Sequence, residues 1–310
     1  MFQFVLRRFL SIFVTQVIVS VLTFGLIFVS GDPATALTPT RPGQQPTEEQ
    51  IEQTRKAYGL DQPIALQYLR YMTRLVQGDM GESYFARKPV TTLLLEKFPI
   101  TFLLTLGIMA VALALGIPIG LLAAYKRNSA IDRAILIFST LLLGAPPFFL
   151  GLMMIFFFAF RLKWFPLGGV GSVWHFVLPT LSIALPTAVG YGLLLRTNVL
   201  NLLNNEYART ARAKGLTTRA VLFRHILPNA LIPVVTIASL DVAILLTGLV
   251  LIEEIFGIPG IGQQIFQAVS RRDIPVVMGS VFFGALLIGL AGVIADVLAA
   301  RLDPRIRIGE

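Results

Sequence analysis

The chain has 310 residues, of which 55% are hydrophobic and only 14% are charged, and its mean hydropathy is +0.76. Because an average soluble domain carries about 25% charged residues, this composition excludes an ordinary water-soluble protein and indicates a membrane protein. The sequence contains no cysteine, which excludes disulfides, thiolate metal sites and cysteine nucleophiles.

Six apolar stretches are each about as long as a helix that crosses roughly 30 Å of hydrocarbon. They cover residues 9–29, 98–125, 134–160, 176–195, 226–252 and 274–300. The first follows Arg7 and Arg8 and precedes no small-residue cleavage site, so we interpret it as a retained span. The predicted fold is therefore an all-α membrane protein with six transmembrane helices.

The distribution of lysine and arginine predicts the orientation of these helices. With a cytoplasmic N-terminus, 14 of the 26 basic residues fall on the cytoplasmic side and four fall in short outer loops. The long segment 30–97 carries the other eight, balanced by eight acidic residues. Both termini are thus expected in the cytoplasm, and the net charge of +9 is explained by topology without a nucleic-acid partner.

The outer segment between the first two spans is expected to be partly helical. A breaker-rich stretch, 39–46, precedes two short predicted helices, 47–58 and 63–76, and Thr47 is the expected N-cap of the first. A turn at 78–81 and an amphipathic stretch at 90–98 lead into the second span. This segment either docks an external partner or packs on the chain as a lid, and the sequence leaves both open.

The loop between the fourth and fifth spans is the most informative connector. Residues 204–216 predict a short helix of alanines and cations that ends at Gly215, a residue that accepts a left-handed conformation. Such a loop is either a solvated, positively charged connector or a helix inserted into a cleft of a partner. Its small residues, which permit close approach of a backbone, favour the second interpretation.

Two acidic residues lie within the later spans. Asp241 is near the middle of the fifth, where a charge costs about 2.5–3.5 kcal/mol on insertion scales, so it should face the bundle interior or water. It is either part of a translocation path or a member of a buried interhelical hydrogen bond. Asp296 lies about a turn from Arg301, so we interpret it as a pairing or capping residue and not as part of an aspartyl dyad.

Several enzyme classes lack their motifs. No lysine follows a glycine, so the phosphate loop of ATP-binding proteins is absent, and no G-x-S-x-G elbow occurs. His175 and His225 are 50 residues apart and cannot form an H-E-x-x-H zinc helix. A hydrolase using Asp241 and Asp296 is thus disfavoured, whereas an ion-coupled carrier that acts alone through Asp241 stays as an alternative.

The loop at 204–228 resembles the EAA loop of type I ABC importer permeases. The pattern of that loop places E-A-A before an obligatory glycine, and these slots hold Arg209, Thr210, Ala211 and Gly215 here. Arginine in the glutamate slot is typical of the peptide-permease branch. The motif of that branch, Y-x-R-T-A-R-A-K-G, is reproduced by residues 207–215. The resemblance implies that the ATPase-coupling residues are Glu206, Tyr207, Arg209, Thr210, Ala211, Arg212, Lys214 and Gly215.

Further segments in the same order resemble this branch, so the resemblance covers nearly the whole chain. They are Gly31-Asp32-Pro33, Tyr58-Gly59-Leu60-Asp61, Gln67-Tyr68, Gly78-Asp79-Met80-Gly81-Glu82-Ser83, Glu254-Ile255-Phe256, Pro259-Gly260-Ile261-Gly262, Arg272-Asp273-Ile274-Pro275 and Asp303-Pro304-Arg305-Ile306-Arg307. The chain is similar to the B-type permease of dipeptide, oligopeptide and nickel importers.

The resemblance implies an organisation in three parts. Residues 1–97 hold the first helix and the extracytoplasmic helical cap, residues 98–300 form the type 1 permease core, and residues 301–310 form a cytoplasmic tail. The implied location is the bacterial cytoplasmic (inner) membrane, with multiple spans in contact with lipid.

The same resemblance implies a transport subunit and not an enzyme. Its expected partners are a second related permease, two ATPases that bind ATP and Mg²⁺, and an extracytoplasmic solute-binding protein, and no cofactor is expected in this chain. Peptide is the favoured substrate, because no cluster of histidines or carboxylates marks a metal path. Nickel chelate, glutathione and oligosaccharide are the alternatives.

Overall fold

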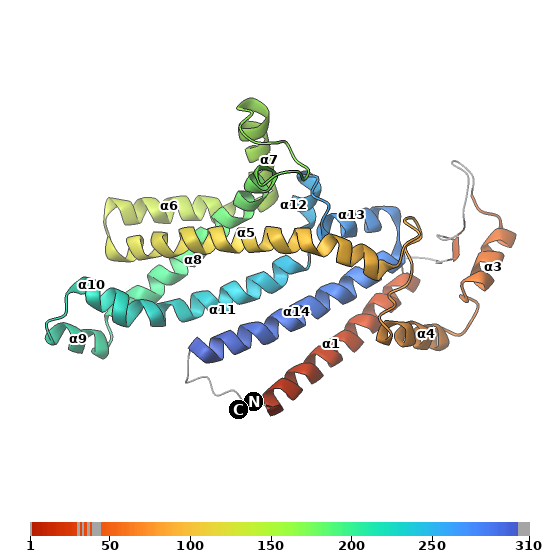
Figure 1. Cartoon of the computed structure of the whole chain (residues 1–310), viewed down its shortest axis with the longest axis horizontal. Coiled ribbons are helices and arrows are strands. Elements are labelled where there is room, and N and C mark those ends of the chain that lie inside the picture. Colours follow the sequence, from red (N-terminus) through yellow and green to blue (C-terminus); the bar gives the residue numbers. More distant parts are fainter. Residues whose placement is uncertain (1, 30–31, 33, 36–37, 39–44, 303–310) are drawn as a thin grey trace.

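The computed structural model describes residues 2–29, 32, 34–35, 38 and 45–302. Most of the stretch at 39–46, Gly31 and Pro33, and the tail motif from Asp303 to Arg307 therefore lie outside the described residues. The helices in chain order are α1 (Phe2–Val29), α3 (Glu48–Ala57), α4 (Ile64–Val76), α5 (Val90–Tyr125), α6 (Ala130–Gly144), α7 (Pro147–Met154), the π-helix η1 (Ile155–Arg161), α8 (Trp174–Leu203), α9 (Glu206–Ala213), α10 (Thr218–Ala220), the π-helix η2 (Val221–Ile226), α11 (Leu227–Leu246), α12 (Val250–Ile255), α13 (Ile261–Arg271) and α14 (Ile274–Leu302) (Figure 1).

The described residues contain five helices that are long and apolar enough to cross a membrane, and a sixth span when two bent helices are combined. The combined pair is α6 with α7–η1, which meet at 98°. The predicted span at 134–160 is therefore present only as two helices with a sharp bend between them. Proline has no N–H and disfavours helix in the residue before it, and Ala145, which precedes Pro146 and Pro147, is extended with φ −88° and ψ 126°.

The predicted fifth span is also too long at its C-terminal end. Hydropathy is continuous over 226–252, but α11 ends at Leu246 and a separate helix, α12, begins at Val250. Gly248 adopts φ +117°, and a Cβ there would lie 2.8 Å from the backbone nitrogen of Gly262. Only glycine fits this turn, which folds α12 back against the start of α13.

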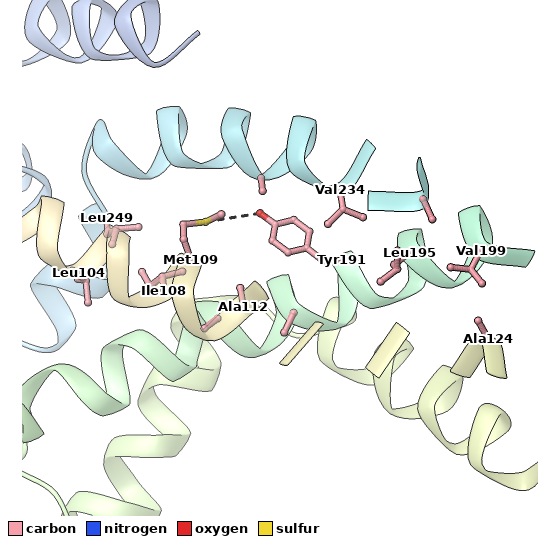
Figure 2. Packing of buried hydrophobic residues seen from close by; sticks show 14 of the residues in the cluster. Leu104, Ile108, Met109, Ala112, Ala124, Tyr191, Leu195, Val199, Val234 and Leu249 are labelled. Atoms are coloured by element: carbon pink, nitrogen blue, oxygen red, sulfur yellow. Dashed lines mark hydrogen bonds between the residues drawn. The ribbon is translucent and has the colours of Figure 1, made fainter. Parts of the chain in front are cut away.

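The core of the bundle is a close pair of helices, α5 and α8. A Cβ on Gly116 would lie 2.5 Å from the carbonyl oxygen of Ala188, and one on Gly120 would lie 2.4 Å from that of Gly192. Small residues spaced four apart let two helix backbones approach, and these two glycines of α5 bring its backbone against that of α8. Helix α11 covers the same pair, and the buried side chains of all three meet in one cluster (Figure 2).

The bundle has two ends that differ in what they carry. Helices α9 and α10 lie at one end, here called the loop end, whereas α3, α4 and α13 lie at the opposite end, here called the cap end (Figure 1). Helices α1 and α14 pack side by side, and Arg8 of α1 forms an ion pair with Asp296. Asp296 is thus a pairing residue, as predicted, and its partner comes from the first span.

The cap, defined as residues 45–89, folds as the sequence predicted. Its helices α3 and α4 correspond to the predicted helices 47–58 and 63–76. Thr47 caps α3 in a reciprocal capping box, since its hydroxyl oxygen accepts from the Gln50 nitrogen at 3.4 Å and its own nitrogen donates to the Gln50 side chain at 3.1 Å. Asp32, the described member of the Gly-Asp-Pro motif, pairs with Arg55 of α3 at 2.7 Å.

Candidate functional site

The predicted loop helix is present as α9 and ends as expected. Gly215 has φ +82°, and the Leu216 nitrogen donates to the Ala211 carbonyl at 3.3 Å, which satisfies an end carbonyl of the helix. A Cβ built on Gly215 meets no atom within 4 Å. The glycine is therefore required within this chain by its backbone conformation and not by crowding.

Helix α9 has one buried face and one exposed face. Ala208 is fully buried and Ala211 is 8% exposed, and both belong to the core cluster through contacts with η2. The opposite face is exposed and carries the polar members of the predicted coupling set, namely Glu206, Arg209, Thr210 and Lys214. Tyr207 and Arg212 lie in the same helix, but their side chains are outside the described ones. Ala211 thus anchors the helix and does not face outward.

The helix that begins with α10 continues into the fifth span without a break. Thr217 caps α10 by accepting from the Ala220 nitrogen at 3.3 Å, and the chain then passes through η2 directly into α11. Val221 and Ile226 of η2 are fully buried. A π-helical segment inside a helix often marks a functional position. The π-helix η2 contacts α9 and continues directly into α11.

Asp241 lies inside the bundle and bonds to another helix. Its Oδ2 accepts a hydrogen bond of 2.6 Å from the hydroxyl of Tyr191 in α8. That hydroxyl also lies 3.9 Å from Sδ of Met109 in α5, the contact drawn as a dashed line in Figure 2. The interhelical hydrogen bond, which the sequence left as one alternative, is therefore present. Asp241 itself is only half-buried, whereas Tyr191 is 4% exposed.

A buried ion pair near the loop end escaped the sequence reasoning. Both oxygens of Asp132, at the start of α6, accept hydrogen bonds of 2.7 Å from the guanidinium of Arg196 in α8. The Asp132 side chain is 2% exposed, and its Oδ2 also accepts from the Asn128 nitrogen at 2.9 Å. The partners are 64 residues apart, so only the tertiary fold brings them together. The pair fixes α6 to α8.

A buried carboxylate at the cap end was also missed. Glu253 of α12 is fully buried, and its two oxygens accept from the Thr101 hydroxyl at 2.8 Å and from the Gln263 nitrogen at 3.0 Å. The hydroxyl oxygen of Thr101 in turn accepts a hydrogen bond of 2.9 Å from the Ile261 nitrogen. Burial raises the pKa of Glu253, and these hydrogen bonds oppose that rise. The carboxylate holds the N-terminus of α13 against α5.

The cap is joined to the last span by a second buried carboxylate. Asp273, just before α14, is 4% exposed and accepts from the Ser83 hydroxyl at 2.5 Å and from the Tyr84 nitrogen at 3.2 Å. A Cβ on Gly279 would lie 2.5 Å from Val90 Cγ1, so the side chain at the start of α5, directly after the cap, packs on the glycine of α14. Two of the segments that resemble the peptide permeases, 78–83 and 272–275, therefore meet in one contact although they are far apart in sequence.

The helical bundle is similar to that of a solved importer. A chain in the structure titled "Inward facing conformations of the MetNI methionine ABC transporter" aligns with a TM-score of 0.57 at 18% identity, over 68% of this chain and 96% of that chain. The model of the binding-protein-dependent transport system inner membrane components matches residues 116–308, and the model of their N-terminal part matches residues 1–105. Together with the fold and the loop helix, these matches define a permease subunit of an ABC importer, which is a transport component and not an enzyme. The chain belongs to the family of binding-protein-dependent transport system inner membrane components.

Curated relatives extend over the whole chain. The glutathione transport system permease protein GsiC of Escherichia coli K12 is 35% identical over 308 residues, and the oligopeptide transport system permease protein AppB of Bacillus subtilis is 36% identical over 318 residues. Each alignment covers 99% of this chain and 99% of the relative. The predicted importer class and multi-pass inner-membrane location are confirmed. Such a subunit works with a partner ATPase and a binding protein, and the hydrolase alternative does not fit this family.

Proposed function

We propose that this chain forms half of the translocation path of an ATP-driven peptide importer. Its loop end faces the cytoplasm, as the positive-inside distribution favours, and two ATPases that bind ATP and Mg²⁺ act there. A second related permease completes the path, a solute-binding protein delivers substrate at the cap end, and this chain carries no cofactor of its own. Its relatives include an oligopeptide permease and a glutathione permease, which supports a short peptide as substrate over a nickel chelate or an oligosaccharide.

The observation that carries this proposal is the two-faced geometry of α9. Its exposed face presents Arg209, Thr210 and Lys214 to a partner, while Ala208 and Ala211 tie the helix to η2. A groove with acidic side chains suits the exposed cations. Because η2 continues into α11, displacement of α9 by a closing ATPase pair moves the fifth span.

The test replaces Gly215 with valine. A β-branched residue resists φ +82°, so the end of α9 should be distorted while the bundle, which no Cβ at this position touches, stays folded. We expect the reconstituted complex to lose at least about tenfold in ATP-driven uptake, with normal assembly, a change of about 1.4 kcal/mol in coupling. Uptake is measured in proteoliposomes with labelled trialanine and the binding protein.

A matched control comes from the other end of the chain. Gly78 has φ +80° and likewise no atom within 4 Å of a built Cβ, so Gly78→Val introduces the same backbone conflict in the cap. Uptake by this variant should exceed that by Gly215→Val by several fold. Full uptake by Gly215→Val, or equal losses in the two variants, would overturn the coupling role of α9.

Within the path, we assign Asp241 to the ammonium group of a passing peptide. Its hydrogen bond to Tyr191 orients one oxygen, and its partial exposure leaves the carboxylate reachable. Asp241→Asn should reduce uptake of trialanine more than uptake of its N-acetyl form, whereas Tyr191→Phe, which keeps the charge, should affect both alike. Unchanged uptake of all substrates by Asp241→Asn would leave the residue with a structural role only.

A further inference from the structure

A cavity of about 660 Å³ lies between the cap and the bundle. Its lining comes from five places: Phe24 of α1, the turn between α3 and α4, one face of α4, the turn at 79–87, and the first residues of α14. Cavities that bury small ligands usually measure about 300–1,000 Å³. The space is thus large enough for a peptide of a few residues.

The walls of this cavity are aromatic and ordered. The ring of Tyr71 stacks on Phe24 with a centroid distance of 5.8 Å, and Tyr58 meets Tyr84 edge to face at 6.3 Å. Met278 of α14 also lines the cavity. Rings and a thioether provide contact area to side chains of different shapes without demanding one sequence. Such walls suit a ligand whose side chains vary.

The charges around the cavity are only partly paired. Arg74 and Asp79 form an ion pair of 2.8 Å, and Asp79 also accepts from the Gly81 nitrogen at 2.8 Å. Among the residues that the structure describes, no side chain forms an ion pair with the three other charged groups that line the cavity: Arg70, Arg87 and Glu82. The site thus offers two available cations and one available anion.

The backbone at Arg87 supports a role for its side chain. Arg87 has φ +52°, a left-handed conformation that costs energy for a residue with a Cβ. Its nitrogen donates to the Ser83 carbonyl at 3.1 Å, and Ser83 is itself bonded to Asp273. The tightly held turn keeps the guanidinium-bearing residue at the cavity.

We propose that this cavity is a second peptide-binding site, separate from the path through α11, that recognises short zwitterionic peptides by their termini. Arg70 and Arg87 bind the terminal carboxylate, Glu82 binds the terminal ammonium, and the rings of Tyr58, Tyr71 and Tyr84 contact the side chains. The choice of peptide as ligand rests on the proposed function. The site lies where a peptide leaving a binding protein at the cap end would first meet the permease.

The test measures binding to the complete permease–ATPase complex in phosphatidylcholine nanodiscs without the binding protein. Trialanine, its C-terminal amide and its N-acetyl form are compared by equilibrium dialysis. We expect both modified forms to bind about tenfold more weakly than trialanine. In the Arg70→Gln/Arg87→Gln variant, trialanine should bind as weakly as its amide, and in Glu82→Gln it should bind as weakly as its N-acetyl form.

The matched control is Arg55→Gln, which removes an arginine of the same segment that pairs with Asp32 and does not line the cavity. It should leave all three affinities unchanged. All of the substituted residues except Arg55 are exposed, and Arg55 is partly so, and thermal unfolding of each variant verifies that the cap stays folded. Equal affinity for trialanine and its amide in the unsubstituted complex overturns the proposal, as does unchanged binding by the double variant.

Two further arms distinguish a peptide site from a lipid site and from the transport path. If the double variant changes peptide binding only in nanodiscs that contain phosphatidylglycerol, the cavity holds a lipid headgroup and the proposal is wrong. Trialanine uptake with the binding protein is measured in parallel. Uptake without cavity binding overturns this site and leaves the importer function intact, whereas cavity binding without uptake of any peptide supports this site and counts against the importer function.

Discussion

The two regions that project from the ends of the bundle, α9 and the cap, are attached to it in different ways. Helix α9 rests on two alanines, Ala208 and Ala211, and is linked to the bundle through a turn, α10 and η2. The cap is held by the Asp273 hydrogen bonds and by a second contact, in which Tyr68 bonds to Ser20 of α1 at 2.9 Å. Buried polar groups are costly to leave without their partners. We therefore expect the cap to be held in one position and α9 to move more readily.

The largest effect should come from Asp132→Ala, in the buried contact between α6 and α8. The change leaves Arg196 buried without its partner, which typically costs about 3–5 kcal/mol in the free energy of unfolding. Denaturant titration of the purified complex measures it. The exposed pair of Arg74 with Asp79 is the control, since Arg74→Ala removes that pair alone and should cost about 0–1 kcal/mol. Equal losses in the two variants would contradict a clamp between α6 and α8.

A smaller effect on stability is expected where the cap meets the bundle. Asp273→Ala leaves the Ser83 hydroxyl and the Tyr84 nitrogen without their acceptor, at a cost of about 1–3 kcal/mol in local stability. Hydrogen exchange should accelerate at 79–87 and stay unchanged in α9. Asp61→Ala, at an exposed position between the cap helices, should change neither. Faster exchange in α9 would mean that the two regions are not independent.

The smallest effect tests the internal order of the cap. Thr47→Ala removes the side-chain half of the capping box and should cost about 1 kcal/mol, seen as faster exchange in the first turn of α3. Thr73→Ala, in the last part of α4, removes a hydroxyl that bonds only within its own helix, to the Leu69 carbonyl at 2.8 Å. It should leave exchange in α3 unchanged. Indistinguishable behaviour of the two variants would show that the cap helix needs no N-terminal capping.

Local signals in the sequence were sufficient for the cap helices and for α9. Thr47, Gln50 and Gly215 interact only with residues a few positions away. The local sequence around them therefore determines where α3 begins and where α9 ends. Hydropathy likewise located the spans but not their breaks. Pro146 and Gly248 end helices by backbone geometry inside runs that remain apolar.

The polar contacts of the interior needed the tertiary fold. Tyr191 with Asp241, and Glu253 with Thr101, join residues 50 and 152 positions apart, and no local pattern marks such partners. Glu253 offered one signal, an acidic residue directly after a long apolar run. The structure also extends α8 to Leu203, beyond the end of the predicted span at 195, and Arg196 within this extension pairs with Asp132.

The contact between the glycines of α5 and the backbone of α8 limits how the molecule can change shape. A single methyl group at Gly116 or Gly120 would overlap a carbonyl of the partner helix, so these two helices have no room to rotate or slide against each other. We therefore expect the pair to move as one body. If the proposed transport proceeds by alternating access, its bending would fall to the chain breaks outside the pair, at 144–147 and 246–250, where the helix hydrogen-bond ladder is already interrupted.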